Sequence, residues 1–285
     1  MNEPPPGSAP YTIERSDAEY RRLEVQAEAN AEYVRDGCRR VGVPSGASAI
    51  DVGCGAPGAL LALAEIVGPH GTVVGIDVNA GTVAAAQEIV KRHQAPNITV
   101  IQADINTLDP AAVCPPGRFD LAFCHHVLFH QADPVTTVRQ MAALVRSEGH
   151  VLMQEIVLDT RCAAPPLVDP ASRALQQWYR FTEEVIRHAG GHPEIAQFLE
   201  ETSTAAGLQP LRQHAYMTGR GPQGAGQVLQ GAIDTLGGMR KAIVAHTIAT
   251  DVEVDALLGA LVEEQSMTYR TFLAPLYVEM IARVP

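Results

Sequence analysis

Short apolar segments alternate with longer amphipathic segments between residues 47 and 157. The apolar segments are those expected of buried strands: "SAIDVG", "TVVGID", "ITVIQAD", "FDLAFCHHV" and "GHVLMQEIV". The segments between them, such as "GALLALAEIV" and "DPVTTVRQMAALVR", have apolar residues at helical spacing. This alternation predicts a mostly parallel, doubly wound α/β sheet, and such sheets bind ligands beyond the carboxyl ends of their strands.

The N-terminal part of the chain follows a different pattern. Residues 1–10, "MNEPPPGSAP", are rich in proline and predict disorder. Ser16 is a candidate N-cap, and Glu19 three residues later completes a capping box. The loose apolar stripe that follows predicts a helical arm within residues 11–46, ahead of a single domain over residues 47–285.

The regular alternation ends near Asp159. The segment "TRCAAPPLVDPAS" predicts a loop, and the segments "PLRQHAYMT" and "FLAPLYVEMIARV" predict two more strands, which brings the expected sheet to seven. Helical patterns dominate residues 160–200 and 222–270, after the fifth strand and before the last one. We expect these insertions to form a lid or a wall of the substrate site. A cap over an apolar edge or a subunit interface, such as that of a homodimer or higher homo-oligomer, is the alternative.

The net charge of the chain is −11, from 21 Lys and Arg against 32 Asp and Glu. This balance argues against nucleic acid and against an anionic membrane surface as partners. Its cysteine count of 5 is odd and includes no C-x-x-C pair, which is typical of reduced thiols. Without a signal peptide or an apolar run of membrane-spanning length, we expect a cytoplasmic protein.

A glycine-rich loop follows the first expected strand, and it can be interpreted in two ways. Gly53, Gly55 and Gly58 spell G-x-G-x-x-G, the fingerprint of a dinucleotide site. However, Asp51 lies two residues before the first glycine, and Pro57 removes one backbone donor from the turn. A carboxylate beside two phosphates costs electrostatic energy, whereas an ammonium favours it. The loop therefore favours a zwitterionic, cationic ligand over a pyrophosphate.

Two further aspartates lie at the ends of successive strands. Asp77 ends the second expected strand, where a carboxylate can accept hydrogen bonds from both ribose hydroxyls. Asp104 ends the third, where a carboxylate can accept from the amino group of adenine, with Val78 or Ile105 against the ring. Together with the loop, these residues predict a site for an adenosine.

The motifs "DVGCGAPG", "GIDV", "QADI" and "FDLAFCHHVLFHQADP" resemble the successive motifs of class I S-adenosylmethionine-dependent methyltransferases. The segments "SDAEYRRLEVQA", "HQADP" and "GHVLMQE" resemble a bacterial small-molecule branch that includes natural-product methyltransferases. The resemblance covers residues 11–157 well and implies a seven-stranded Rossmann-like sheet, with S-adenosylmethionine as cofactor and S-adenosylhomocysteine as product. Pro57 departs from the pattern, since the family usually has glycine there.

The resemblance also implies roles for particular residues. The loop residues Gly53, Cys54 and Gly55 would approach the methionyl and ribose parts by backbone, and Asp51 would act on the amino group. His125 would lie beside the methionine portion. The arm would close over the cofactor through Tyr11, Tyr20 and Gln26.

Methyl transfer from a sulfonium is an SN2 displacement, which needs alignment and exclusion of water, and a base only where the nucleophile carries a proton. The candidate bases are His126, His125 and Glu155, near the ends of the fourth and fifth strands. The histidines do not have metal-ligand spacing, so we expect no metal. An aromatic cluster near Trp178 favours an aromatic or apolar small-molecule acceptor.

Other functions stay open at this point. A protein of the same fold could keep S-adenosylmethionine bound and catalyse cyclisation or isomerisation without methyl transfer. A nicotinamide oxidoreductase would use the literal glycine motif, and Asp51, Pro57 and Asp104 count against it. The sequence does not distinguish O-, N- and C-methylation and does not identify the acceptor.

Overall fold

The computed structural model describes residue 13 and residues 17–158, 167–169, 171–219, 221–269 and 271–285. The segment expected to be disordered, residues 1–10, lies outside the described residues, and so does Tyr11.

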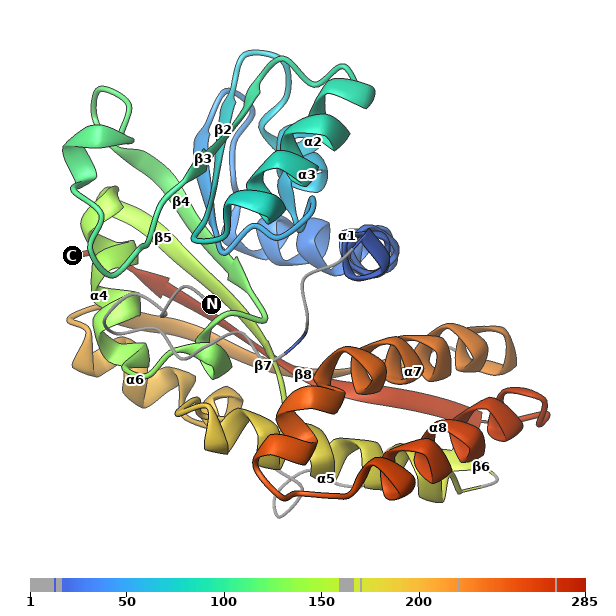
Figure 1. The fold of residues 1–285 in the computed structure, drawn as a ribbon. Helices are drawn as coiled ribbons and strands as arrows, with labels where there is room; N and C mark the ends of the chain where they lie inside the picture. The colour runs from blue at the N-terminus through green and yellow to red at the C-terminus, as the bar shows by residue number, and fades with distance from the viewer. Residues whose placement is uncertain (1–12, 14–16, 159–166, 170, 220, 270) are drawn as a thin grey trace.

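One mixed sheet forms the centre of the molecule (Figure 1). Its strands are β1 (Ser48–Val52), β2 (Thr72–Asp77), β3 (Ile98–Gln102), β4 (Phe119–His125), β5 (Val145–Ile156), β6 (Leu167–Asp169), β7 (Gln209–Gly219) and β8 (Thr271–Arg283). The strand order is β3-β2-β1-β4-β5-β8-β6, and β7 pairs with the other edge of β8. Strands β1 to β5 are mutually parallel and β8 is antiparallel to β5. The predicted doubly wound α/β fold is confirmed.

The seven expected strands all form, and the sheet contains one further short strand. Residues Leu167–Asp169, predicted as loop, form β6 and pair with the beginning of β8. The reason lies in the length of β8: its pairing with β5 ends at Ile156 opposite Tyr277, so its first residues have an open edge. An unpaired strand edge presents free N–H and C=O groups, which β6 satisfies.

Helices cover both faces of the sheet. The helices α1 (Asp17–Val41), α2 (Leu60–Val67) and α3 (Ala80–Arg92) pack on one face, and α4 (Pro134–Leu144) and α6 (Leu199–Ala205) pack on the other. Strand β4 is buried on both sides, since Leu121 and Phe123 face one hydrophobic cluster and Ala122 and Cys124 face the other. Burial on both faces is typical of a central strand in a parallel sheet.

Local signals fix where the helices begin. The Asn79 side chain accepts a hydrogen bond from Thr82 N at the start of α3, and Asp133 accepts one from Thr136 N at the start of α4. Helix α3 therefore begins directly beyond the carboxyl end of β2, and α4 begins after the short turn Leu128–His130 that follows β4. This places helix N-termini and strand ends at the same edge of the sheet.

The later helices α5 (Arg173–His188), α7 (Gly221–Ala245) and α8 (Asp251–Gln265) lie together around the half of β8 that extends beyond β5 (Figure 1). Helix α7 also contacts α1, the N-terminal arm. The arm and the late helices thus enclose space over the carboxyl edge of the sheet. Within the described residues, no helix is long and apolar enough to cross a membrane.

Candidate active site

A cavity of about 670 Å³ lies beyond the carboxyl ends of β1, β2 and β4. Its floor is the loop that follows β1, and its walls come from α1, α5 and α7. Ligand sites in doubly wound sheets occur at this edge, and the volume falls within the roughly 300–1,000 Å³ of ligand pockets.

The glycine loop brings backbone, without side chains, to the cavity floor. Gly53, Gly55 and Gly58 all have positive φ. A Cβ on Gly53 would lie 2.6 Å from Val127 Cγ2, and one on Gly58 would lie 1.9 Å from the carbonyl oxygen of Cys54. Both positions therefore require glycine. Gly53, Cys54, Gly55 and Gly58 line the cavity, as a cradle for a ligand requires.

Asp77 lies at the end of β2 and borders the main cavity and a smaller one beside it. Its carboxylate accepts hydrogen bonds from Gly55 N at 3.2 Å and from Asn79 N at 2.9 Å. The side chain therefore ties the glycine loop to the start of α3. Its position between the two cavities suits a group in the middle of an extended ligand, such as a ribose.

The smaller cavity, of about 60 Å³, is bordered by Asp77, Val78, Asp104 and Ile105. Asp104 Oδ1 accepts from Asn106 N at 2.9 Å, whereas its Oδ2 is buried and has no hydrogen-bond partner among the described residues. A buried carboxylate oxygen without a partner requires a donor. The residues present therefore fit an adenine whose amino group donates to Asp104.

Two of the residues expected at the cofactor, Asp51 and Tyr20, border neither cavity. The buried Asp51 accepts from Ala59 N at 3.1 Å, and burial, with the nearby charge of Asp77, raises its pKa to about 8. Tyr20 packs on the start of α3, with its hydroxyl 2.4 Å from where a Cβ of Gly81 would lie. Tyr11 lies outside the described residues. Gln26 does line the main cavity.

His125 and His126 follow one another at the end of β4, yet both line the cavity. Successive side chains of a strand point to opposite faces. His126 has a φ of 59°, and this left-handed turn brings the two rings together with their centroids 3.8 Å apart. A non-glycine residue in this conformation costs about 1–3 kcal/mol, and such strain is concentrated at functional sites.

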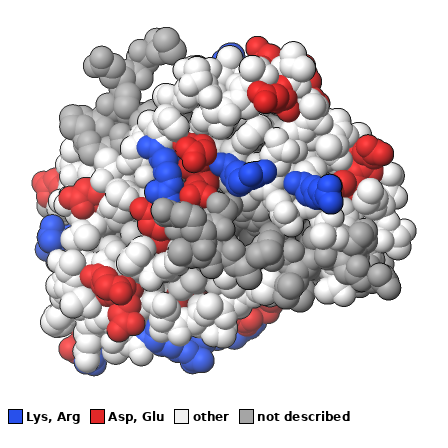
Figure 2. Space-filling view, turned by 90° about the horizontal axis from the view of Figure 1, so that it is seen from below, with Lys and Arg blue, Asp and Glu red and all other residues white. Residues whose placement is uncertain are grey.

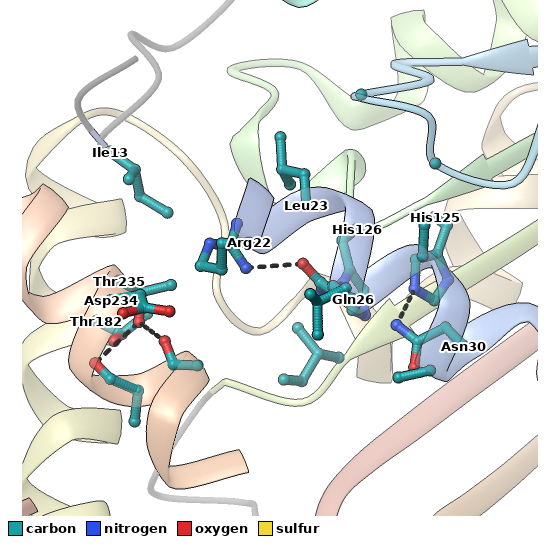
Figure 3. A pocket seen from close by; sticks show the side chains of 18 of the residues that line it. Ile13, Arg22, Leu23, Gln26, Asn30, His125, His126, Thr182, Asp234 and Thr235 are labelled. Carbon is teal, nitrogen blue, oxygen red and sulfur yellow. Dashed lines mark hydrogen bonds between the residues drawn. The ribbon is translucent and has the colours of Figure 1, made fainter. Parts of the chain in front are cut away.

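Each imidazole is hydrogen-bonded to an amide from α1. Gln26 Nε2 lies 3.1 Å from His126 Nδ1, and Asn30 Nδ2 lies 3.2 Å from His125 Nε2 (Figure 3). Gln26 and Asn30 are four residues apart, so they lie on the same face of the helix. This face of α1 holds both rings in place.

Burial favours the neutral form of both imidazoles. Burial lowers the pKa of His125 to about 4, against a side-chain hydrogen bond with Gln154 that raises it. Burial also lowers the pKa of His126 well below its ordinary value, and the charges of its neighbours, including Arg22, lower it further. The tilted ring of Phe129 and the parallel ring of Tyr277 lie against His126, the latter at 5.2 Å between centroids.

Glu155, the third candidate base, lies outside both cavities. Its Oε1 accepts from Val127 N at 3.0 Å and from Leu128 N at 2.8 Å, and burial raises its pKa to about 7. These bonds hold the turn that follows His126. The contacts of Glu155 are thus those of a residue that supports the loop, one step away from the ligand space.

The far end of the cavity is walled by α5 and α7. Trp178 and Tyr179 line it, and Trp178 Nε1 donates to Thr235 Oγ1 at 2.9 Å. Thr182, Asp234 and Thr235 lie together on the side opposite His125 (Figure 3). The apolar residues of this wall include Trp178, Ile186, Val228 and Met239, and its polar residues also include Gln227 and Gln230.

The sequence interpretation missed several lining residues: Arg22, Asn30, Gly231, Asp234 and Tyr277. For Arg22 and Asn30 a signal existed, because they lie four residues before and after Gln26 on one helix face. For the residues of α7 and β8 none existed, since only the fold brings them to the site.

Charged side chains of both signs occur on one face of the molecule (Figure 2). On the face shown in Figure 2, Lys and Arg lie next to Asp and Glu among the coloured residues. In the part of the chain that the structure describes, no group of three or more His, Cys, Asp or Glu is arranged to hold a metal ion.

Comparison with known families gives one match that covers more than half of the chain. The profile of the family described as "Methyltransferase domain" matches residues 44–203. Demethylmenaquinone methyltransferase of Geobacillus sp. is 24% identical over 222 residues, which are 73% of this chain and 92% of the relative. Ubiquinone biosynthesis O-methyltransferase of Albidiferax ferrireducens is 32% identical over 114 residues, which are 39% of this chain and 42% of that one.

Solved structures share the fold at low sequence identity. The (4+2)-cyclase SpnF matches with a TM-score of 0.55 and 17% identity, over 98% of this chain and 86% of that one. Phosphoethanolamine N-methyltransferase 2 of Haemonchus contortus, in complex with S-adenosyl-L-methionine, matches with a TM-score of 0.57 and 14% identity, over 95% of this chain and 57% of that one.

Proposed function

The chain belongs to the methyltransferase-domain family and is an S-adenosylmethionine-dependent enzyme, and from this premise we propose that it methylates a small, aromatic or apolar metabolite of specialised metabolism. The observation that carries the proposal is the single cavity that joins the glycine loop to the apolar wall of α5 and α7. A cofactor on the loop and an acceptor against the wall would share this space.

The cofactor end of the site is built from the loop and two aspartates. Bound there, S-adenosylmethionine supplies a methyl group on a positively charged sulfur. We assign Gly53 and Gly55 to its methionyl part, Asp77 to the ribose, and Asp104 with Ile105 to adenine. The unpartnered Asp104 Oδ2 is the observation that supports the adenine end. Asp51 supports the loop through Ala59, and its effect on the ligand is indirect.

The acceptor end of the site favours a flat or apolar molecule. Ile156 and Leu158 from the end of β5 and Trp178 and Tyr179 from α5 border the same cavity. Aromatic and aliphatic walls stabilise ligands mainly through burial of apolar surface. Two relatives by name act on quinone precursors, which have this chemistry, and this supports an aromatic acceptor without identifying it.

In this proposal the residues of the chain align the acceptor with the cofactor and exclude water, and they contribute less through acid–base chemistry. The arm α1 and the helices α5 and α7 enclose the cavity and would exclude water from the reacting atoms. Alignment of the acceptor with the sulfur–methyl bond accounts for much of the rate of such a displacement. The acceptor is a free small molecule in this proposal, with no nucleic acid or membrane surface as partner.

Calorimetric titration with S-adenosylmethionine and, separately, with NAD tests the cofactor. We expect micromolar binding of the former and none of the latter. Incubation with aromatic and polyketide-like acceptors, with detection of S-adenosylhomocysteine and of the methylated product by mass spectrometry, then tests the transfer.

The outcome also separates the proposal from its main alternative. A conversion of the acceptor that requires bound S-adenosylmethionine but forms no S-adenosylhomocysteine would identify a cyclase or isomerase and overturn the proposed methyl transfer. Asp77→Ala serves as the binding-deficient variant. Asp255→Ala, which removes an exposed carboxylate paired with Arg240 on α8, is its matched control.

A further inference from the structure

Three residues of the site form a chain of hydrogen bonds that determines which nitrogen of His126 carries the proton. Arg22 Nη1 donates to Gln26 Oε1 at 2.8 Å, and Gln26 Nε2 lies 3.1 Å from His126 Nδ1 (Figure 3). A guanidinium has donors and no acceptor. The Gln26 atom that faces Arg22 must therefore be the oxygen, and the atom that faces His126 must be the nitrogen.

This orientation of Gln26 defines the state of the ring. The amide nitrogen can only donate, so His126 Nδ1 must accept with its lone pair. A neutral imidazole with an unprotonated Nδ1 carries its proton on Nε2. His126 Nε2 is buried and has no hydrogen-bond partner among the described residues. The ring thus has an N–H donor without an acceptor among the described residues, on a side chain that lines the cavity.

We propose that His126 donates a hydrogen bond from Nε2 to an oxygen of the acceptor and does not act as a base, and that Gln26 and Arg22 are positioning residues that maintain this state. The proposal rests on the proposed function, because it assigns the acceptor to the same cavity. It replaces the interpretation of His126 as a general base.

The neighbouring ring is held by the protein on the side of α1 and β8. His125 Nε2 is hydrogen-bonded to Asn30. Gln154, which interacts with His125, donates its own Nε2 to Tyr33 O at 3.0 Å and to Glu279 Oε2 at 2.8 Å. Among the described residues, Gln154 Oε1 and His125 Nδ1 have no hydrogen-bond partner, so the printed contact of the His125 ring is the one through Nε2. Asn30 Oδ1 also has no partner that would orient the Asn30 amide, whereas Arg22 orients the Gln26 amide, so His126 is the ring whose tautomer the protein determines.

The donor selects a class of acceptor. An N–H that points at an oxygen favours a phenolate or an enolate over the protonated form, since hydrogen bonds to charged groups are the stronger ones. The acceptor then enters as its anion, after losing its proton to solvent, and no base of the protein is needed. One of its electron pairs forms the bond to the methyl carbon, while the pair of the sulfur–methyl bond stays on sulfur. Anion and sulfonium become two neutral groups.

Nitrogen NMR of the full-length protein tests the tautomer without any turnover. Protein labelled with 15N-histidine is measured with S-adenosylhomocysteine bound, and His126→Asn assigns the signals. We expect a protonated Nε2 and an unprotonated Nδ1 for His126 at neutral pH. A proton on Nδ1 would overturn the proposal.

Gln26→Glu reverses the hydrogen bond and tests the consequence. A carboxylate only accepts, so Nδ1 must then donate, and a neutral ring then has no proton on Nε2. We expect kcat for a phenolic or enolic acceptor to fall about tenfold to a hundredfold, the range of one charge-assisted hydrogen bond. If His126 were the base, this variant would retain or increase kcat, because its Nε2 lone pair would be free, and that result would overturn the proposal.

Asn30→Asp is the matched control for charge. It adds the same negative charge one turn further along the same face of α1, beside His125. We expect the tautomer of His126 to stay as in the wild type in this variant, while it reverses in Gln26→Glu. Reversal in both variants would show that charge alone sets the tautomer and would overturn the role of Gln26. If the wild type methylates no acceptor, the proposed function fails, while the NMR result still decides the tautomer.

Discussion

The unpartnered oxygen of Asp104 makes a specific prediction about which base the site binds. In Asp104→Asn, the new amide keeps an oxygen toward Asn106 N, because that backbone donor needs an acceptor. The amide nitrogen then takes the position of Oδ2, which has no partner in the protein. An acceptor of hydrogen bonds in the smaller cavity thus becomes a donor, with little change in size.

The magnitude follows from one interaction. Adenine would lose a charge-assisted hydrogen bond of about 1.5–3 kcal/mol, and since about 1.4 kcal/mol is tenfold in affinity, the Kd rises about 10-fold to about 100-fold. The stability of the free protein should change little, because Oδ2 makes no bond that the variant breaks. A ligand with a 6-oxo group in place of the 6-amino group, S-inosylhomocysteine, should show the opposite preference.

Calorimetric titration of wild type and variant with S-adenosylhomocysteine and with S-inosylhomocysteine measures this exchange. Asp109→Asn is the matched control, since Asp109 also accepts from the backbone two residues on, at Ala111 N, but lies outside both cavities. Equal losses for the two ligands in Asp104→Asn, or no loss for either, would refute the placement of adenine beside Asp104.

Three further changes test other parts of the site. A Cβ on Gly231 in α7 would meet no atom within 4 Å, so the side chain of Gly231→Leu should project into the cavity and raise the KM for the acceptor at least about tenfold, while the helix gains about 0.5–1 kcal/mol of stability. Gly237→Leu, which lies outside the cavity, is the control. Equal acceptor kinetics in the two variants would contradict the assignment of α7 as a wall of the acceptor site. Asp77→Ala should raise the Kd for S-adenosylmethionine at least about tenfold in calorimetry, and a Kd like that of the wild type would remove the ribose assignment. The pKa of Glu155 is raised by burial from 4.5 to about 7, so the folded state binds the extra proton and stability is lost as pH rises from 4.5 to about 7, by up to about 3 kcal/mol. Glu155→Gln should flatten this slope in urea unfolding at pH 5 and 8, and an unchanged slope would show that another group causes it.

The sheet could be predicted because its information is local. Apolar strands, helical spacing and cap residues such as Asn79 and Asp133 all lie within a few positions of the elements they define. The same logic located Asp77 and Asp104, because parallel strands end at one edge and their last residues must lie close together. The short strand β6 could not be predicted, because its pairing depends on how far β8 extends beyond β5.

Side-chain direction at the strand ends could not be predicted in the same way. Asp51 and Glu155 occupy positions that favour contact with a ligand, yet each accepts hydrogen bonds from backbone amides of the turns, at Ala59 and at Val127 and Leu128. Buried amides of a tight turn require acceptors, and the nearest carboxylates supply them. His126, in contrast to Asp51 and Glu155, does line the cavity, because its left-handed backbone conformation turns the ring there.

The arrangement of charge along the cavity gives the two ends of the site different tasks. Aspartates lie at the cofactor end, the paired imidazoles in the middle are neutral, and the wall of α5 and α7 is largely apolar. A cationic sulfonium is therefore attracted to the end that holds Asp77, while an apolar acceptor is stabilised at the other end by burial. Methyl transfer removes the positive charge of the sulfonium, so this attraction weakens when the product forms. The same carboxylates that recruit the cofactor thus favour its exchange, and neutral histidines between the two ends add no positive charge of their own beside the sulfonium.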